Sequence, residues 1–422
     1  MGRVMRRIAV SGAIRPSAFA LRALADLKPA VARAASEGGS LLRPTGISQY
    51  TFDMIVDCHA HVFEDWLGAC GHPSVDIHLK YIQKNVTRPA AKAFRLRDGK
   101  PANAAMLFRP GDNTWAGLAD VNFRIGRFGR LEFTRDGEDY AVQYMPVGMQ
   151  AIESPPEFML AQMTYAGVDH CILQAGGGYG AMNDFNAAAQ KKYPAKFTGL
   201  LQVDEAIADR PEVLAEVDRA RNVLGLKGVY YSHDFSRHGY ARNLDHVAFA
   251  PFWEKVAGFG LSAFVELSAT PHYDRASYIA NLLALDRVMQ RHRALRFVLV
   301  MGPPVAHFAR DGRWEFPAEV LAAYRRENLL IEIMFPITWG GTWDYPYPQA
   351  QALIRHMREL FGAAKLVWGS DMPNVERFCT YRQCLDYVRR YCTFFSAGEM
   401  DAVLGDTMAE LFGLKVAERL HA

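Results

Sequence analysis

Short apolar runs alternate with segments of helical periodicity along most of this 422-residue chain. Each run has the length and composition of a buried strand, and a predicted helix separates most runs from the next. Strands that alternate with helices predict a parallel sheet covered by helices, and eight such strands predict a (β/α)₈ TIM barrel of the α/β class. The predicted strands cover residues 54–60, 168–175, 197–204, 226–231, 261–267, 296–302, 329–335 and 365–370, and the main helices cover 157–166, 186–192, 211–222, 249–259, 275–291, 318–326 and 349–361.

Two segments interrupt or follow this alternation. A long stretch after the first strand ends in alternating apolar residues on both sides of Asp136-Gly137, which predicts a β-hairpin. Because barrel enzymes keep their sites at the carboxyl ends of the strands, we expect an insertion over residues 70–150 to form a lid over the mouth. Residues 376–417 have the pattern of extra helices packed outside the barrel.

The first 50 residues carry five arginines before the first acid, Asp26, and are rich in Ala and Ser. Organelle-targeting segments have this composition, as does a translated region ahead of a start at Met54. We expect residues 1–50 to be a flexible extension without a part in the chemistry. The barrel domain is then predicted over residues 54–415.

Composition excludes several classes of protein. The net charge is +3 with acids and bases interspersed, so no basic surface for nucleic acid is expected. No apolar run reaches the roughly 18 residues that a membrane span needs. The six cysteines form no Cys-x-x-Cys pair, which is typical of reduced thiols in a cytoplasmic protein.

The first predicted strand ends in His59-Ala60-His61. Side chains alternate between the faces of a strand, so both imidazoles lie on one face, close enough for one metal ion. Taken alone, the pair is also compatible with two ordinary histidines at a strand end. Near the other end of the barrel, Asp371 follows the eighth predicted strand directly.

The stretches MIVDCHAHVF and KLVWGSDMPN, at residues 54–63 and 365–374, resemble the first and last barrel strands of the amidohydrolase superfamily. The resemblance is to the branch that contains aminocarboxymuconate-semialdehyde decarboxylase and its hydrolase relatives, and it covers about residues 54–415. It implies one divalent metal at the barrel mouth, held in part by His59, His61 and Asp371, with Asp371 also taking a proton from the attacking water. It also implies a homodimer.

Two positions depart from the pattern of this family. Glu266 stands where a fifth-strand histidine is expected, and Met301 stands where a sixth-strand histidine is expected. Glu266 is predicted as a fourth ligand, with a role as a hydrogen-bond acceptor or salt-bridge partner left open. Such a ligand set suits Zn²⁺ first, with Mn²⁺ or Fe²⁺ as alternatives. Met301 cannot transfer protons, so general acid or base work has to come from elsewhere.

His233, after the fourth strand, and His307, on the loop after Met301, are the candidates for that work beside Asp371. Lys227 begins its strand at the wrong end of the barrel and is interpreted as structural. For the substrate, the loop TWGGTWDYPYP predicts a flat apolar or aromatic ligand, and packing of the loop against the lid is the alternative. The predicted substrate-binding residues are Trp339, Trp343, Tyr345 and Arg310, the last as a partner for a carboxylate.

Three hypotheses about function follow. The first is a metal-dependent hydrolase that cleaves an amide, ester or lactone bond of a small aromatic or carboxylate-bearing substrate. The second is a decarboxylase of a small unsaturated or aromatic acid. The third, from another class, is a metal-free barrel with a lactonase or binding role.

Overall fold

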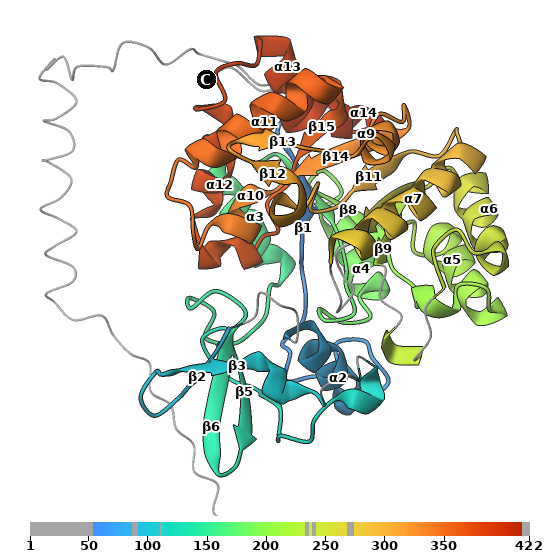
Figure 1. The fold of residues 1–422 in the computed structure, drawn as a ribbon. Coiled ribbons are helices and arrows are strands. Elements are labelled where there is room, and N and C mark those ends of the chain that lie inside the picture. The colour runs from blue at the N-terminus through green and yellow to red at the C-terminus, as the bar shows by residue number, and fades with distance from the viewer. Residues whose placement is uncertain are drawn as a thin grey trace, which may run out of the picture. The chain divides into compact units, whose positions relative to one another are not determined.

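The computed structural model describes residues 54–86, 92–109, 112, 114–232, 236–238, 242–267 and 274–415 (Figure 1). The extension predicted over residues 1–50 lies outside the described residues. All of the described residues belong to one compact unit, 52–422. Among them, no helix has both the length and the hydropathy that crossing a bilayer requires.

Eight parallel strands form the central sheet, in the order β1-β7-β8-β9-β10-β11-β14-β15. Strands follow one another in chain order, which confirms the predicted (β/α)₈ barrel. Apolar residues fill both faces of these strands, as expected where helices cover a parallel sheet. The bounds are β1 Val56–Ala60, β7 His170–Leu173, β8 Phe197–Leu201, β9 Gly228–Ser232, β10 Ser262–Glu266, β11 Phe297–Leu299, β14 Leu329–Ile333 and β15 Leu366–Trp368.

The helices between the strands begin and end within a few residues of the predicted bounds. Their termini carry ordinary signals: α5 begins at Pro211 with Glu212 in its first turn and has Arg219 and Arg221 in its last turn, in line with the helix dipole. The main helices are α3 Pro156–Ala166, α4 Asn183–Lys192, α5 Pro211–Asn222, α6 Ala250–Gly258, α7 Arg275–Arg291, α9 Ala318–Tyr324 and α11 Pro348–Phe361. Short helices α8 Val305–Phe308 and α10 Phe335–Trp339 follow β11 and β14.

Three C-terminal helices follow β15, and the last of them packs against β1 and β10. They are α12 Tyr381–Arg389, α13 Ala397–Asp401 and α14 Thr407–Phe412, and α12 and α13 each begin with a capping box. Phe412 packs on Phe264 of β10 with ring centroids 6.0 Å apart. A Cβ on Gly405 would lie 1.8 Å from the Met54 carbonyl oxygen, so only glycine allows this approach to the start of β1.

The barrel closes where β1 meets the segment after β15. The backbone N–H of His61 donates to the Met372 carbonyl, and the N–H of Asp371 donates to the His59 carbonyl, both at 2.8 Å. Beneath them, the buried carboxylate of Asp57 accepts hydrogen bonds from Ser370 and from the Tyr381 hydroxyl. Burial raises the pKa of Asp57 to about 6 although these hydrogen bonds oppose it.

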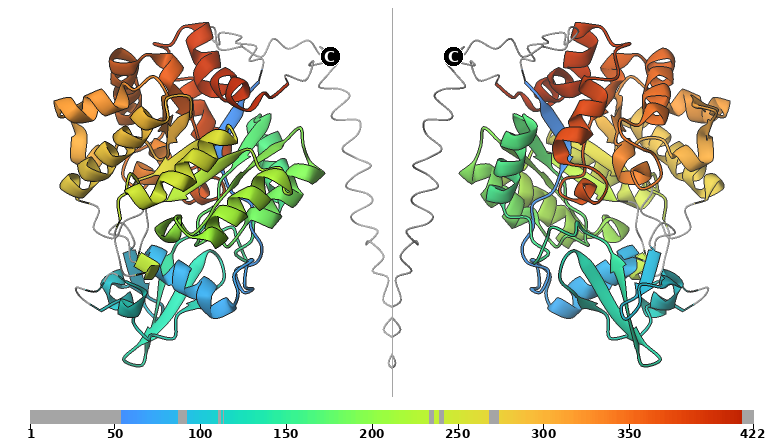
Figure 2. Two further views of the ribbon diagram at one scale, coloured as in Figure 1. Left: turned by 90° about the vertical axis from the view of Figure 1, so that its right-hand side faces the viewer. Right: turned by 90° about the vertical axis from the view of Figure 1, so that its left-hand side faces the viewer.

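A second layer of structure is inserted between β1 and β7. It contains α2 Val75–Val86 and a five-stranded antiparallel sheet in the order β3-β2-β6-β5-β4, and Figures 1 and 2 show it beyond one end of the barrel. Asp136 and Gly137 form the turn between β5 and β6 with positive φ angles of 53° and 77°, as the hairpin pattern predicts. The strands are β2 Lys92–Arg95, β3 Pro101–Asn103, β4 Arg124–Ile125, β5 Arg130–Arg135 and β6 Glu138–Gln143.

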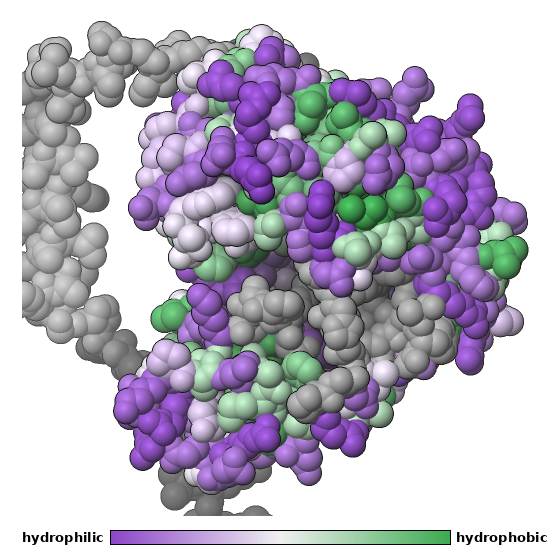
Figure 3. Space-filling view, in the orientation of Figure 1, coloured by the Kyte–Doolittle hydropathy of each residue, from purple (hydrophilic) through white to green (hydrophobic). Residues whose placement is uncertain are grey.

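The insertion has its own apolar core, in which Trp66, Leu131 and Phe133 are fully buried. The face drawn in Figure 3 mixes hydrophilic residues with smaller apolar patches and carries no continuous apolar surface over the described residues. The insertion and the barrel therefore each have a packed apolar core.

Candidate active site

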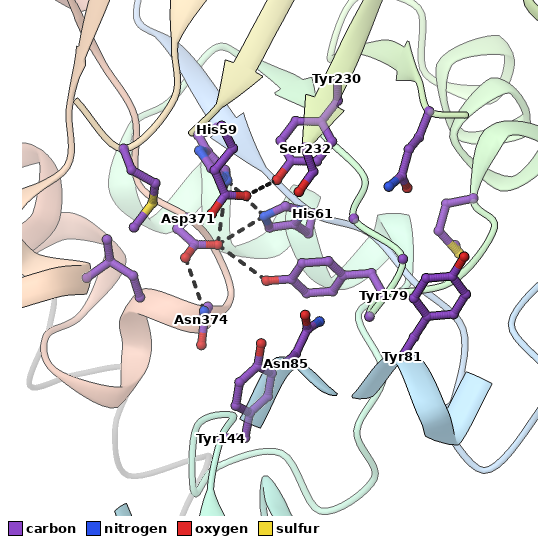
Figure 4. A pocket seen from close by; sticks show the side chains of 18 of the residues that line it. His59, His61, Tyr81, Asn85, Tyr144, Tyr179, Tyr230, Ser232, Asp371 and Asn374 are labelled. Carbon is purple, nitrogen blue, oxygen red and sulfur yellow. Dashed lines mark hydrogen bonds and ion pairs between the residues drawn. The ribbon is translucent and has the colours of Figure 1, made fainter. Parts of the chain in front are cut away.

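A cavity of about 1180 Å³ lies at the carboxyl ends of the barrel strands, and the insertion forms one of its walls. Its barrel side carries a cluster of polar side chains around His59, His61 and Asp371, and its insertion side includes Tyr81 and Tyr144 (Figure 4). The barrel contributes His59, His61, Glu266, Met301, Glu332 and Asp371, and the insertion contributes Tyr81, Asn85, Phe94, Trp115 and Tyr144.

Three side-chain atoms converge at the base of this cavity (Figure 4). The Nε2 atoms of His59 and His61 are 3.0 Å apart. Oδ1 of Asp371 lies 3.0 Å from Nε2 of His61 and 3.8 Å from Nε2 of His59. All three residues are buried. The barrel closure produces this cluster, because the same backbone pairing that joins β1 to the segment after β15 brings Asp371 beside the histidines.

The other ring nitrogens decide what these atoms can bind. Nδ1 of His59 lies 3.2 Å from both carboxylate oxygens of Glu332, and Nδ1 of His61 lies 3.1 Å from the Gln174 carbonyl. Both partners only accept hydrogen bonds, so each Nδ1 carries a proton, and each Nε2 turns toward the cavity as the ring nitrogen that a metal ion can take.

Two imidazole nitrogens and a carboxylate oxygen then face one another across a space that a proton or a metal ion can occupy. Ligands about 2.1 Å from one metal ion stand roughly 3.0–3.5 Å from each other, close to the spacing observed here. The tethering of Nδ1 by a carboxylate or a carbonyl is also what metal-binding histidines show. The donor set therefore fits one divalent metal ion.

Electrostatics in the cluster agree with this fit. Burial lowers the pKa of His59, but the negative charge and hydrogen bond of Glu332 outweigh it and raise this pKa to about 9. Burial likewise lowers the pKa of His61, and there it prevails over Asp371. Burial raises the pKa of Asp371, yet the two imidazoles lower it below its usual value. The pocket is thus built around carboxylates that hold positive charge.

Glu332 of β14 is a site residue that the sequence analysis missed. Its carboxylate is only 1% exposed and accepts hydrogen bonds from the Cys58 thiol and from the backbone N–H of Met301 in addition to His59. A Cβ on Gly369 would lie 2.5 Å from Oε1 of Glu332, so this close packing requires glycine. The available signal was one acidic residue inside the apolar run LLIEI, since buried acids are rare unless they are paired.

Tyr179 is a second missed residue. Its ring stacks on His61 with centroids 4.0 Å apart, and its hydroxyl donates to Oδ1 of Asp371 at 3.4 Å. Tyr179 belongs to GGGYG, whose glycines fit the loop under α2: a Cβ on Gly177 would lie 2.6 Å from the Tyr81 ring, and one on Gly178 would lie 1.9 Å from Nδ2 of Asn85. On the other side, Asn374 donates to Oδ2 of Asp371 at 3.1 Å.

The family model described as Amidohydrolase matches residues 56–414. The chain belongs to the amidohydrolase family. This confirms the resemblance drawn from the two end strands. No curated protein sequence matches this amidohydrolase.

Solved structures similar to this amidohydrolase have TIM-barrel folds but low identity. A probable 2-pyrone-4,6-dicarboxylic acid hydrolase from Acinetobacter baumannii is 17% identical over 62% of this chain and 90% of its own, with a TM-score of 0.47. A 2,6-dihydroxybenzoate decarboxylase from Rhizobium is 16% identical over 64% and 90%, with a TM-score of 0.46. A 5-carboxyvanillate decarboxylase from Sphingomonas paucimobilis is 20% identical over 61% and 82%, with a TM-score of 0.42.

Glu266 lies at the carboxyl end of β10, as predicted, and lines the cavity of the amidohydrolase. Among the described residues, the convergent ligand atoms come from His59, His61 and Asp371, without Glu266. Instead, the hydroxyl of Tyr230, on the neighbouring strand β9, donates to Oε2 of Glu266. This is the hydrogen-bond acceptor role that the sequence analysis left open. Met301 follows β11 and lines the cavity with a positive φ of 65°.

Two further residues discussed in the sequence analysis, His307 and Lys227, lie outside the cavity lining of the amidohydrolase. His233 lies outside the described residues. His307 is partly buried in α8, beside the lining residues Val305 and Ala306 but outside the lining itself. Lys227, interpreted as structural, precedes β9 and donates its backbone N–H to Gly199.

Of the predicted substrate-binding residues, Trp339 lines the cavity. Trp343 lies behind it and stacks on its ring with centroids 5.2 Å apart. Tyr345 is 37% exposed and packs edge-on against Tyr347 and Tyr391. The side chain of Arg310 is 73% exposed and lies 4.0 Å from Glu315. The cavity lining includes none of these last three.

Proposed function

We propose that this amidohydrolase is a metal-dependent hydrolase that cleaves an amide, ester or lactone bond of a small molecule. The observation that carries the proposal is the convergence of His59, His61 and Asp371 at the base of a large cavity. A divalent metal ion held there, Zn²⁺ first and Mn²⁺ or Fe²⁺ as alternatives, would activate water and polarise a carbonyl group.

The side chains around the cluster have separate roles in this proposal. Asp371 accepts the proton of the attacking water, and hydrogen bonds from Tyr179 and Asn374 hold its two oxygens in place. Glu332 keeps His59 in the tautomer that leaves Nε2 free. The pair formed by Tyr230 and Glu266 gives a proton to the leaving group and is reprotonated from solvent, while Asp371 releases to solvent the proton taken from the attacking water. His307 and the undescribed His233 keep no part in this scheme.

The insertion acts as the lid of the cavity in this proposal. It contributes the aromatic wall that contains Tyr81, Trp115 and Tyr144, and Trp339 faces them from the barrel. Such a wall excludes water and suits a flat, partly apolar ligand. A cytoplasmic location and a homodimer remain predictions from the sequence.

A decarboxylase of a small unsaturated or aromatic acid is the second candidate. The Tyr230–Glu266 pair favours it, because decarboxylation requires a group that protonates the carbon left behind by CO₂. The aromatic walls of the cavity suit such acids equally well. In the decarboxylase branch, general acid and base catalysis is attributed to a sixth-strand histidine. Met301 stands at that position here, which argues against this candidate.

Elemental analysis of the purified protein beside H61A and E266A tests the metal site. We expect about one equivalent of metal in the wild type, loss of the metal in H61A, and retention of the metal in E266A. Full turnover after complete chelation would overturn the proposal. Assays of ester, amide and lactone hydrolysis, run beside assays of CO₂ release from hydroxybenzoates, then separate the hydrolase from the decarboxylase.

A further inference from the structure

We propose that Arg377 binds an anionic group, in the simplest case a carboxylate, of the molecule that occupies the cavity. The inference rests on the proposed function, since it assigns this anion to the substrate of the same site. It replaces the exposed Arg310, which the sequence indicated for this role, with a residue inside the cavity.

The arginines of the cavity lining differ in their partners. Arg219 donates to Asp184 and Glu216, and Arg237 donates to Asp204. Arg377 also lines the cavity, but none of the ion pairs among the described residues includes it. A partly buried guanidinium without a carboxylate partner costs free energy that a bound anion would recover.

The guanidinium of Arg377 is held in place by contacts that leave its charge unneutralised. Its Cζ atom lies 4.8 Å from the ring centroid of Phe378 and 5.9 Å from that of Tyr144. Its Nε donates to the backbone carbonyl of Asn374 at 3.3 Å, and no described residue accepts a hydrogen bond from the two terminal nitrogens. These two nitrogens form the edge that pairs with both oxygens of a carboxylate.

The glycines of the TWGGTW segment support this arrangement. A Cβ on Gly340 would lie 2.6 Å from Cβ of Phe378, and one on Gly341 would lie 3.3 Å from the Phe378 ring. Glycine at these positions therefore lets Phe378 pack against the loop after β14 and present its ring to Arg377. This loop therefore acts through Phe378 as well as through Trp339, which lines the cavity itself.

Arg377 also lies within electrostatic reach of the metal cluster. It ends the short helix η7, Asn374–Arg377, whose first residue donates to Asp371. Burial raises the pKa of Asp371, and the charge of Arg377 is one of those that lower it. An anion on Arg377 and a reacting group beside His61 would then belong to one small molecule. The rings of Tyr144 and Tyr179 line the space as well, which favours a flat substrate with a carboxylate at one end.

Two matched esters test the proposal: anionic 4-acetoxybenzoate and neutral phenyl acetate. In R377Q we expect kcat/KM for 4-acetoxybenzoate to fall about 10- to 100-fold, mainly through KM, with phenyl acetate unchanged within about twofold. R377K should recover part of the loss. The control variant is K100Q, because the side chain of Lys100 is 73% exposed and lies outside the cavity lining, and both esters should be unchanged in it. An equal loss for both esters, or no loss for either, would overturn the proposal.

Calorimetric titration with benzoate and with benzamide separates this inference from the hydrolase proposal. If the wild type hydrolyses neither ester but binds benzoate, and R377Q binds it at least about 10-fold more weakly, then the anion site stands and the hydrolase proposal fails. Equal benzoate affinity in the two proteins, or no benzoate binding by the wild type, would overturn the anion site.

Discussion

The two sides of the barrel mouth are held in very different ways. On the side of β1 and β15, backbone pairing and the buried carboxylates of Asp57 and Glu332 fix His59 and Asp371. On the side of β10 and β11, Glu266 accepts a hydrogen bond from the hydroxyl of Tyr230, and the side chain of Met301 is neither an acid nor a base. The departures from the family pattern both fall on this second side.

The difference shows which part of such a site can change. On the first side, each ligand also takes part in closing the barrel, so a substitution there disturbs fold and site together. On the second side, the side chains project from strands that are paired without them. A glutamate or a methionine can stand there while His59, His61 and Asp371 keep their places.

Asp57→Asn should have the largest effect. The carboxylate accepts hydrogen bonds from the backbone N–H of His59, the N–H and hydroxyl of Ser370, and the hydroxyl of Tyr381. Because an amide cannot accept all of them, the free energy of unfolding should fall by about 3 kcal/mol or more, with loss of bound metal. Urea unfolding measures this, and Y381F, which removes one donor, should cost only about 1 kcal/mol. A wild-type midpoint in D57N would contradict this account of the closure.

The free energy of unfolding should fall at acid pH because of His170, which lies away from both sides of the mouth. Burial lowers the pKa of His170 from 6.5 to about 4, where Nδ1 donates to the Ala195 carbonyl and Nε2 accepts from Thr198. Between these values the unfolded chain binds a proton that the folded chain does not, so stability falls as pH falls through this range and is unaffected above it.

The loss attributable to His170 should reach about 2–3 kcal/mol near pH 4. Urea unfolding of the wild type and of H170Q at pH 7.5, 5.5 and 4.5 checks it, and the variant should give the shallower curve. Since His78 in the insertion carries a similar shift, to about 4, H78Q should flatten the curve as well. Parallel curves for all three proteins would rule out both assignments.

Glu332→Gln and Glu266→Gln compare the two sides directly with one chemical change. The first should weaken metal binding about 10- to 100-fold, because the carboxylate that orients His59 is lost. The second should leave metal affinity unchanged within about twofold and lower turnover only. Competition with a chromophoric chelator gives both affinities. Equal weakening in the two variants would make Glu266 a ligand after all.

Arg310→Ala should have the smallest effect. The side chain is exposed and its ion pair with Glu315 is long, so stability should change by less than about 0.5 kcal/mol. kcat/KM for an anionic ester should stay within about twofold of the wild type, in contrast to R377Q. A loss of kcat/KM as large as that in R377Q would show that Arg310 binds the substrate carboxylate.

The barrel could be predicted from the sequence because its signal is repeated. Each strand and helix carries its own apolar pattern, so an error in the bounds of one element leaves the alternation of strands and helices recognisable. The three residues whose ligand atoms converge were also within reach, since the His-x-His spacing and the position of Asp371 are local features of strand ends. The hairpin at Asp136 belongs to the same class of local signal.

The supporting residues could not be predicted because their roles depend on neighbours from distant parts of the chain. Glu332 matters through its contact with His59, and Arg377 matters because no acid among the described residues forms an ion pair with it. Tyr179 lies in a glycine-rich loop whose shape follows from packing under α2. Aromatic loop residues such as Trp343 and Tyr345 look alike in sequence whether they face a ligand or one another.

The pairing of β1 with the segment after β15 also sets an order of events during biosynthesis. The two histidines leave the ribosome early, and the aspartate that completes their cluster comes from the eighth strand of the same barrel. A nascent chain therefore carries two ligands without the third until nearly the whole barrel has been made. Loading of the proposed metal would in this way be confined to chains whose last strand has docked, and metal content would become a measure of completed folding.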